Sequence, residues 1–326
     1  MDMRQLGQTD MRISRVGFGA WAIGGGGWKH GWGASDDDDS IATIHRALDL
    51  GVNWIDTAPV YGVGHSEEVV GRALKGRSDR PYVFTKCGLL GNRETDDVEN
   101  TLEPDSIRRE IEDSLRRLGV DVIDLYQIHW PDPDPAIEDA WATLVELKQQ
   151  GKVRHIGVSN FDASQLERVH GIHPVESLQP HYSLLSRDVE GDVLPWCEKN
   201  GTGVIAYSPM ESGLLTGKMT RERIESLPDD DWRRNSPDYQ EPALTANLEL
   251  VDRLSAVAER HGCQPGAVAI AWVLGHPAVT GAIVGARRPD QVEGTVAGGS
   301  LQLTEDDLRE IGVPPRRHES YLPATV

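Results

Sequence analysis

Short apolar runs alternate with longer amphipathic segments along almost the whole of this chain. The runs have the length of strands and are bounded by polar or turn-forming residues, which is typical of buried strands. We expect strands at residues 15–19, 53–56, 82–86, 123–129, 153–159, 177–179, 204–207 and 282–285. The segments between them carry apolar residues at three- and four-residue spacing, which predicts amphipathic helices.

The clearest helical segment is 104–118, in which Ile107 and Ile111 begin a row of apolar residues on one face. Acidic residues lie toward its start, arginines toward its end, and a glycine follows as a stop. Similar patterns, each followed by a glycine, predict helices at 39–50 and 136–150.

Strands that alternate with helices of this length pair in parallel, and eight such units predict an α/β fold, the closed (β/α)8 TIM barrel. We expect residues 1–326 to form one such domain. Two segments exceed the repeat. Residues 6–11 predict a short hairpin that plugs the N-terminal end of the barrel. Residues 218–241 form a long polar loop after the seventh strand, where a lid, a substrate-binding loop and an irregular surface excursion are the alternatives.

The composition is that of a globular protein, with 38% hydrophobic and 26% charged residues and a net charge of −19. Such a charge opposes binding to nucleic acid or to anionic membranes, and any anionic cofactor would need local basic residues. The chain has no apolar run of about 20 residues and no signal pattern at its start, so we expect a cytoplasmic protein. Nothing in the pattern specifies an oligomeric state.

Metal and disulfide chemistry receive no support from the sequence. The three cysteines form an odd set with no metal-ligand spacing, and Cys87 is expected to be a buried small residue rather than a redox centre. The run Asp36-Asp37-Asp38-Asp39 precedes a helix, where negative charge favours a capping role over a metal site.

The segment 17–22 matches the glycine fingerprint of doubly wound dinucleotide-binding folds. That fingerprint requires a helix to open at once, whereas four glycines at 24–27 cannot begin a stable helix. We therefore expect a loop at the mouth of the first strand instead.

Four residues carry the candidate chemistry: Asp56, Tyr61, Lys86 and His129, each at or just after a predicted strand end. The C-terminal ends of barrel strands meet at one mouth, so these side chains are expected to form one site. A phenol beside a lysine, with a carboxylate for the lysine and an imidazole nearby, makes a proton donor usable near neutral pH, which suits reduction of a carbonyl. Each residue alone has an ordinary structural explanation, and only their joint placement indicates catalysis.

With these residues in place, the chain resembles the aldo-keto reductase superfamily from end to end. The segments that carry the resemblance are 19–21, 55–62, 85–86, 124–131, 156–161, 179–183, 207–209, 214–218 and 284–288. The loop after strand seven and the run His-Trp-Pro-Asp-Pro from His129 are most similar to bacterial general-stress-type members, relatives of the potassium-channel β-subunits.

The resemblance implies a role for each of the four residues. Tyr61 would be the general acid, Lys86 would lower the pKa of its phenol, Asp56 would hold Lys86, and His129 would orient the carbonyl. A small carbonyl compound would be the substrate, and Trp21, Trp28, Tyr61 and Trp130, with Trp32, would line its pocket.

The resemblance also implies a nicotinamide cofactor. Ser159, Asn160 and Gln179 would bind its carboxamide, and Tyr207 would stack on its ring. Further cofactor contacts would come from Ala20, Trp21, Asp56, Ser208, Pro209, Met210, Gly213, Leu214, Lys218, Gly285, Arg287, Arg288 and Gln291. Arginine forks at the adenosine end favour NADPH over NADH. One departure concerns the adenine contact, where many members carry asparagine and this chain has Thr295.

Two other functions share these features. A non-catalytic NADP(H)-binding regulatory or redox-sensing subunit would keep every motif. A barrel isomerase or hydrolase would use the carboxylate and the histidine without a nicotinamide.

Overall fold

The computed structural model describes residues 1–27, 31–228 and 231–312. Within them, eight parallel strands close into a barrel in the order β10-β11-β12-β3-β4-β5-β8-β9. The strands are β3 (Val16–Gly19), β4 (Trp54–Asp56), β5 (Tyr82–Cys87), β8 (Ile123–Ile128), β9 (Val153–Ser159), β10 (Ser177–Gln179), β11 (Gly203–Ala206) and β12 (Val279–Gly285). The predicted (β/α)8 barrel is confirmed, and each predicted strand overlaps one of these eight.

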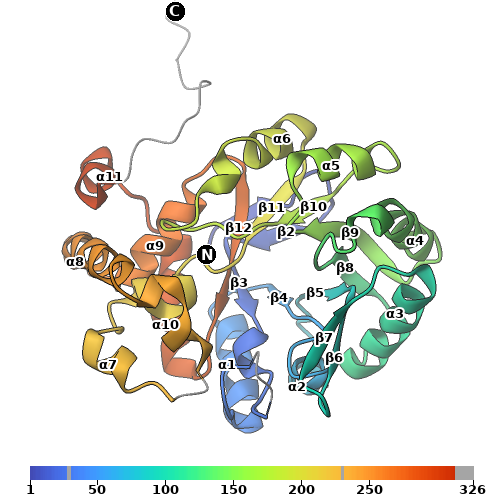
Figure 1. The fold of residues 1–326 in the computed structure, drawn as a ribbon, viewed down its shortest axis with the longest axis horizontal. Coiled ribbons are helices and arrows are strands. Elements are labelled where there is room, and N and C mark those ends of the chain that lie inside the picture. Colours follow the sequence, from blue (N-terminus) through green and yellow to red (C-terminus); the bar gives the residue numbers. More distant parts are fainter. Residues whose placement is uncertain (28–30, 229–230, 313–326) are drawn as a thin grey trace, which may run out of the picture.

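Helices surround the barrel on its outside (Figure 1). They are α1 (Asp37–Asp49), α2 (His65–Leu74), α3 (Pro104–Leu118), α4 (Ile137–Gln149), α5 (Ala163–His170), α6 (Val193–Asn200), α8 (Ala243–His261), α9 (Pro265–Leu274), α10 (Pro289–Val296) and α11 (Glu305–Ile311). Helix α3 has the predicted bounds. The acidic run caps α1 as expected, because the Asp36 side chain accepts hydrogen bonds from the backbone N–H groups of Asp38 and Asp39.

The interior of the barrel is closed at its N-terminal end by a hairpin of β1 (Met3–Gln5) and β2 (Arg12–Ser14). The turn of the hairpin carries Leu6 and Met11, both fully buried against the inward side chains Trp54 and Phe84. The expected plug is therefore confirmed. Packing here is tight, because a Cβ atom on Gly17 would lie 2.2 Å from the Trp54 ring.

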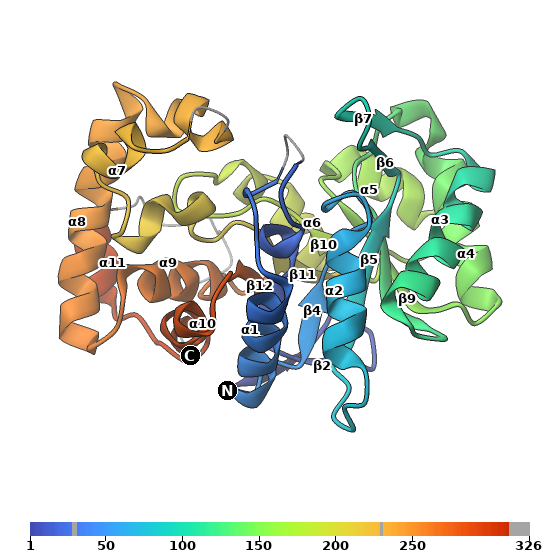
Figure 2. The ribbon, with the colours of Figure 1, turned by 90° about the horizontal axis from the view of Figure 1, so that it is seen from below.

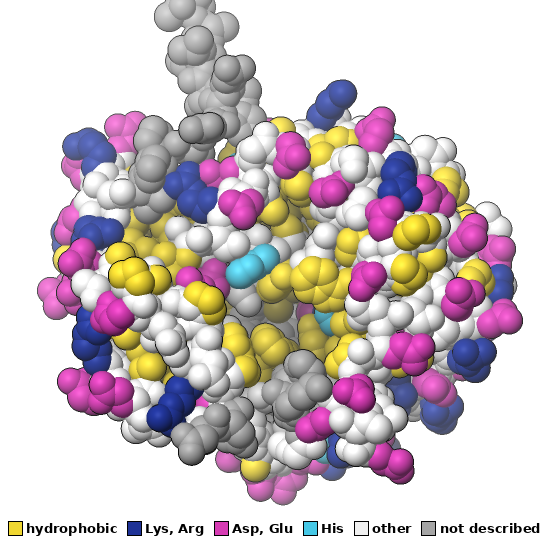
Figure 3. All heavy atoms as spheres, viewed as in Figure 1, with side chains coloured by type: hydrophobic (Ala, Val, Ile, Leu, Met, Phe, Trp, Pro, Cys, Tyr) yellow, Lys and Arg dark blue, Asp and Glu magenta, His cyan; other side chains and the backbone are white. Residues whose placement is uncertain are grey.

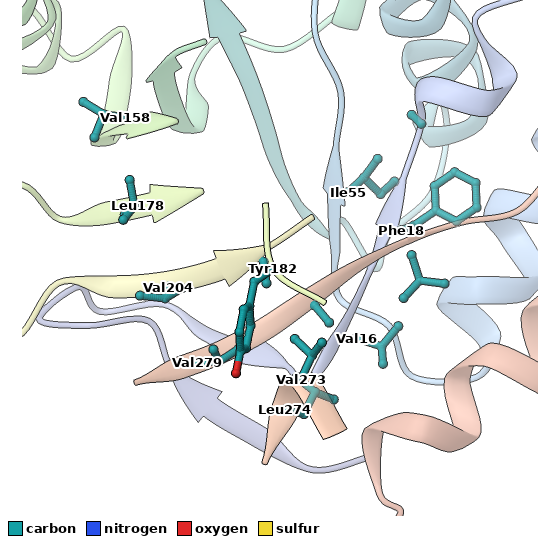
Figure 4. Close-up of a cluster of buried hydrophobic side chains, with 14 of the residues drawn as sticks. Val16, Phe18, Ile55, Val158, Leu178, Tyr182, Val204, Val273, Leu274 and Val279 are labelled. Carbon is teal, nitrogen blue, oxygen red and sulfur yellow. The ribbon is translucent and has the colours of Figure 1, made fainter. Parts of the chain in front are cut away.

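A second apolar layer fills the space between the strands and the outer helices. Figure 4 shows part of it, where Val16 and Phe18 of β3 and Val279 of β12 point outward toward the helices. Among the described residues, no helix is long and apolar enough to cross a membrane.

Two further structures rise at the mouth, at the end of the barrel opposite the plug (Figure 2). One is a hairpin of β6 (Leu89–Asn92) and β7 (Asp97–Asn100), which the sequence did not predict. The other is the long loop after β11. Its described part folds into α7 (Arg221–Glu225) and two short 3-10 turns, at Trp232–Asn235 and Pro237–Tyr239. Since Tyr239 and Ile224 are buried in one apolar cluster, this segment is packed rather than an irregular excursion.

Candidate active site

A cleft of about 820 Å³ opens at the C-terminal mouth of the barrel. Figure 3 shows a hollow in this face with apolar side chains and a histidine inside it, while acidic side chains dominate the surface around it. Asp56, Tyr61 and His129 line this cleft, and so do Arg287 and Arg288. The structure thus brings three of the four predicted catalytic residues to one cavity, with the fourth directly behind them.

The fourth residue, Lys86, is fully buried beneath the cleft. Its Nζ atom donates to Asp56 Oδ1 at 2.6 Å, to the Thr57 carbonyl at 3.0 Å and to Tyr61 Oη at 3.3 Å. An ammonium has three N–H groups, so these three acceptors fix its orientation. The ammonium charge is therefore held against the phenol oxygen.

The pKa of the Tyr61 phenol depends on its burial as well as on Lys86. Burial raises the pKa of Tyr61 above its ordinary value of 10.0; the Lys86 charge lowers it and the Asp56 charge raises it further. Lys86 acts in the expected direction on the phenol pKa, but desolvation of the phenolate outweighs it, so the pKa of Tyr61 is raised on balance. The phenol keeps its proton through neutral pH. Burial alone would lower the pKa of Lys86, but Asp56 and Tyr61 raise it on balance, so the ammonium stays charged.

His129 follows β8 and meets the ring of Tyr61 edge-on, with ring centroids 5.9 Å apart. Burial, and then the Lys86 charge, hold the pKa of His129 well below 6.5, so the imidazole is neutral. Its Nδ1 atom is buried and has no hydrogen-bond partner among the described residues. A neutral imidazole at the edge of the cleft can share one hydrogen bond with a carbonyl oxygen but cannot act as a strong acid.

The three residues expected to bind a carboxamide already form a bonded network. Asn160 has a positive φ of 64°, its Nδ2 donates to the His129 carbonyl at 3.0 Å, and its Oδ1 accepts from Tyr207 Oη at 2.9 Å. Ser159 Oγ donates to the Gln179 carbonyl at 2.8 Å. All of these side chains line the cleft, so hydrogen bonds connect its lining residues before any ligand binds.

Gln179 has a second partner that sequence reasoning missed. Its Nε2 donates to Asp56 Oδ2 at 2.8 Å, on the carboxylate whose other oxygen accepts from Lys86. The Asp56 carboxylate is therefore held at both oxygens. No local signal marks this contact, because residues 56 and 179 come from strands on different sides of the barrel.

The loop after β11 lines one wall of the cleft with Ser208, Pro209, Met210, Gly213 and Lys218. Leu214, predicted among the same contacts, is different. Its side chain is fully buried in the apolar cluster of the long loop, so it could reach a ligand only through its backbone.

Basic side chains also line the cleft. These are Lys218, Arg223, Arg233, Arg287 and Arg288. Arg287 donates from Nη1 to the Trp32 carbonyl at 3.0 Å and from Nη2 to the Ala34 carbonyl, and Gln291 Oε1 accepts from its backbone N–H at 2.8 Å. Arg223 and Arg233 were not singled out from the sequence, although the loop that carries them is visibly rich in arginine.

Aromatic side chains form the wall near Tyr61. Trp21 stacks on Tyr61 with ring centroids 6.1 Å apart and, at the same distance, on Trp232 of the long loop. Trp32 and Trp130 also line the cleft, as expected. Trp232 was not predicted. Trp28, which was, lies outside the described residues.

Apolar side chains of the unpredicted hairpin complete the wall near Tyr61. Leu89 and Val98 line the cleft beside Val60. Asn100 adds one amide, whose Nδ2 donates to Asp132 Oδ2. The hairpin of β6 and β7 has a mostly polar sequence, so no alternation of apolar and polar residues predicted it.

These features fit a dinucleotide. The cleft has a flat ring at Tyr207, amide groups, and a set of basic side chains that stands out against a net charge of −19. At Gly213 the backbone is open, since an added Cβ would meet nothing within 4 Å. The described residues contain no cluster of side chains that could hold a metal ion.

The fold and the site together are those of a barrel oxidoreductase, with Tyr61, Lys86 and Asp56 hydrogen-bonded to one another at the cleft. The sequence model of the Aldo/keto reductase family matches residues 15–312, and the chain belongs to this family. The predicted resemblance is thereby confirmed, and the family uses a nicotinamide cofactor.

Individual relatives are similar over nearly their full length. The aldo-keto reductase YhdN of Bacillus subtilis (strain 168) is 38% identical, covering 95% of this chain and 92% of its own. The NADH-specific methylglyoxal reductase of Escherichia coli (strain K12) is 37% identical, covering 93% and 94%. The solved structure of the glycerol dehydrogenase AKR11B4 from Gluconobacter oxydans is 42% identical, with a TM-score of 0.87, covering 100% and 98%.

Proposed function

We propose that this protein reduces aldehydes or ketones to alcohols with NADPH and that Tyr61 donates the proton. The observation that carries the proposal is the contact of a fully buried, charged Lys86 with the Tyr61 hydroxyl at 3.3 Å, at the floor of the cleft. A buried ammonium aimed at a phenol oxygen stabilises negative charge that develops there during proton transfer.

Each residue of the site has its own role in the proposed carbonyl reduction. A bound nicotinamide supplies the hydride that reaches the carbonyl carbon. Tyr61 gives its proton to the carbonyl oxygen, and the phenolate that remains is stabilised by Lys86. Neutral His129 donates a hydrogen bond to the same oxygen and so orients it. Asp56, held by Gln179, keeps Lys86 in place and charged.

The raised pKa of Tyr61 agrees with the direction of this reaction. A proton donor must carry its proton at the working pH, and burial ensures this at neutral pH. The same burial makes the phenolate costly, so the lysine is needed once the proton has left.

The arginine side chains that line the cleft support NADPH over NADH as the cofactor. A 2′-phosphate dianion is best bound by arginine forks, and Arg287 and Arg288 line the cleft with Arg223. One relative is an NADH-specific methylglyoxal reductase, so the preference of this protein for NADPH over NADH requires its own test. Arg288→Ala is the sharper variant to test, because Arg287 also holds the backbone at Trp32 and Ala34.

The experiment measures consumption of NADPH, with NADH in parallel, against a panel of aromatic and short aliphatic aldehydes. We expect turnover with a higher kcat/KM for NADPH and a loss of that preference in Arg288→Ala. Tyr61→Phe should lose most turnover and still bind the cofactor. Cofactor binding with a single stoichiometric oxidation and no turnover would favour the regulatory alternative. An absence of binding would overturn the proposal.

A further inference from the structure

Tyr207, the flat ring of the cleft, is backed by a second ring. His181 stacks on it with centroids 5.1 Å apart and ring planes 9° from parallel. Tyr207 lines the cleft and His181 does not, so the tyrosine ring stands between the histidine and the cavity. The two residues are paired by a β-bridge just beyond β10 and β11, which fixes both backbones.

His181 also lies against a buried carboxylate. Its Nε2 is 3.0 Å from Glu211 Oε1 but has no hydrogen-bond partner among the described residues, whereas Ser183 Oγ donates to the same oxygen. Glu211 is only 7% exposed although it belongs to a surface loop. On its other ring nitrogen, His181 Nδ1 lies 3.3 Å from Ser186 Oγ.

Glu211 occupies a strained part of the loop that lines the cleft. Ser208, Glu211 and Ser212 have positive φ angles of 55°, 45° and 51°, which side-chain-bearing residues rarely adopt. Strain of this kind persists only where the surroundings enforce it. The enforcing contacts are the Ser183 hydrogen bond to the carboxylate, the close approach of His181 to it, and hydrogen bonds from Tyr239 Oη to the Glu211 and Ser212 carbonyls at 3.0 and 3.1 Å.

We propose that His181 and Glu211 are positioning residues for the nicotinamide cofactor. They hold the Tyr207 ring and the backbone of residues 208–213 in their binding geometry before the cofactor arrives. This inference rests on the proposed function. Its consequence is an affinity effect, because a preformed site spares the cofactor the cost of ordering it.

The choice of histidine follows from the two contacts it makes. A planar ring is required to stack on Tyr207, and a polar ring nitrogen is required to face the Glu211 carboxylate. Phenylalanine would keep the first contact and lose the second, and alanine would lose both. These two substitutions therefore separate the effect of stacking on Tyr207 from the effect of the polar contact with Glu211.

The experiment measures the dissociation constant of NADPH by quenching of tryptophan fluorescence, beside kcat at saturating cofactor. We expect His181→Ala to raise the dissociation constant about 10-fold and His181→Phe about 3-fold, with kcat within about 3-fold of wild type. Glu211→Gln should behave like His181→Phe. His45→Ala, at a half-buried histidine of α1 that does not line the cleft, is the matched control and should change neither quantity.

The outcomes separate this inference from the proposed function. A wild-type protein that binds and turns over NADPH, with unchanged affinity in His181→Ala, would overturn the inference alone. A wild-type protein that binds neither nicotinamide would overturn both. If His181→Ala fails to fold, the His181→Phe and Glu211→Gln affinities decide the matter in the same way.

Discussion

Replacement of Lys86 by methionine tests the catalytic arrangement most directly. Methionine has a similar length and an apolar, flexible side chain, so it fills the space of the lysine without its charge. The variant removes the ammonium that touches both Asp56 and Tyr61. It therefore separates the charge from the shape of the site.

The structure sets the size of the effect. A unit positive charge 3.3 Å from a full phenolate stabilises it by about 5 kcal/mol at an effective dielectric constant of about 20. Because the phenolate forms as the proton leaves, that stabilisation acts on the reaction rather than on the resting enzyme. The turnover number for carbonyl reduction should fall by about three to four powers of ten.

The same substitution also destabilises the fold, for a different reason. It leaves the Asp56 carboxylate, which is 2% exposed, without its ionic partner, and removal of one member of a buried pair costs about 3–5 kcal/mol of unfolding free energy. The double variant Lys86→Met/Asp56→Asn removes the stranded charge, and the new amide can still accept the bond from Gln179. We expect the double variant to regain most of the stability and none of the activity.

The assays are reduced-nicotinamide consumption, urea unfolding and the pH profile of kcat. Wild-type turnover should hold through neutral pH and fall only as pH rises above 10.0, where the Tyr61 phenol loses its proton. In Lys86→Met the residual activity should persist to still higher pH, because the lysine charge no longer lowers the phenol pKa. A double variant that regained stability and also turned over within about tenfold of wild type would refute the electrostatic role of Lys86.

Three further outcomes are expected. In steady-state assays, Trp232→Ala should raise KM for bulky aromatic aldehydes more than for short aliphatic ones, because it removes one ring of the aromatic stack at the mouth. Equal changes in KM for both kinds of aldehyde would exclude a role of Trp232 in binding the aromatic substrates. Gly17→Ala should lower the unfolding free energy by at least about 2 kcal/mol in urea titrations, because its Cβ would overlap the Trp54 ring. His155 contacts Asp10 of the plug turn at 2.7 Å; burial alone would lower the pKa of His155, but its two carboxylate partners raise it above 6.5. The stability from this contact is complete below pH 6.5 and is lost as pH rises through the raised pKa, so the deficit of His155→Gln in melting temperature should shrink in alkaline buffer.

The sequence by itself determined the architecture and brought out the four candidate residues at the mouth, Asp56, Tyr61, Lys86 and His129. The eight strands and helix α3 could be predicted because local periodicity reports which face of an element is buried. The four residues could be grouped because residues at strand ends in a barrel must converge on one mouth, whatever the exact helix bounds. The same reasoning identified the hairpin plug from a short segment before the first strand.

Tertiary structure alone decided the energetics and the contacts between loops. The sequence places a lysine near Tyr61 but does not say how far the phenol is removed from water, and burial raises the phenol pKa by more than the lysine lowers it. Gln179 meets Asp56, and Trp232 meets Trp21, across long separations in the chain. Hydrophobic periodicity carries information only about neighbours within one helix or strand. Desolvation and long-range contacts depend on the tertiary structure of the whole chain.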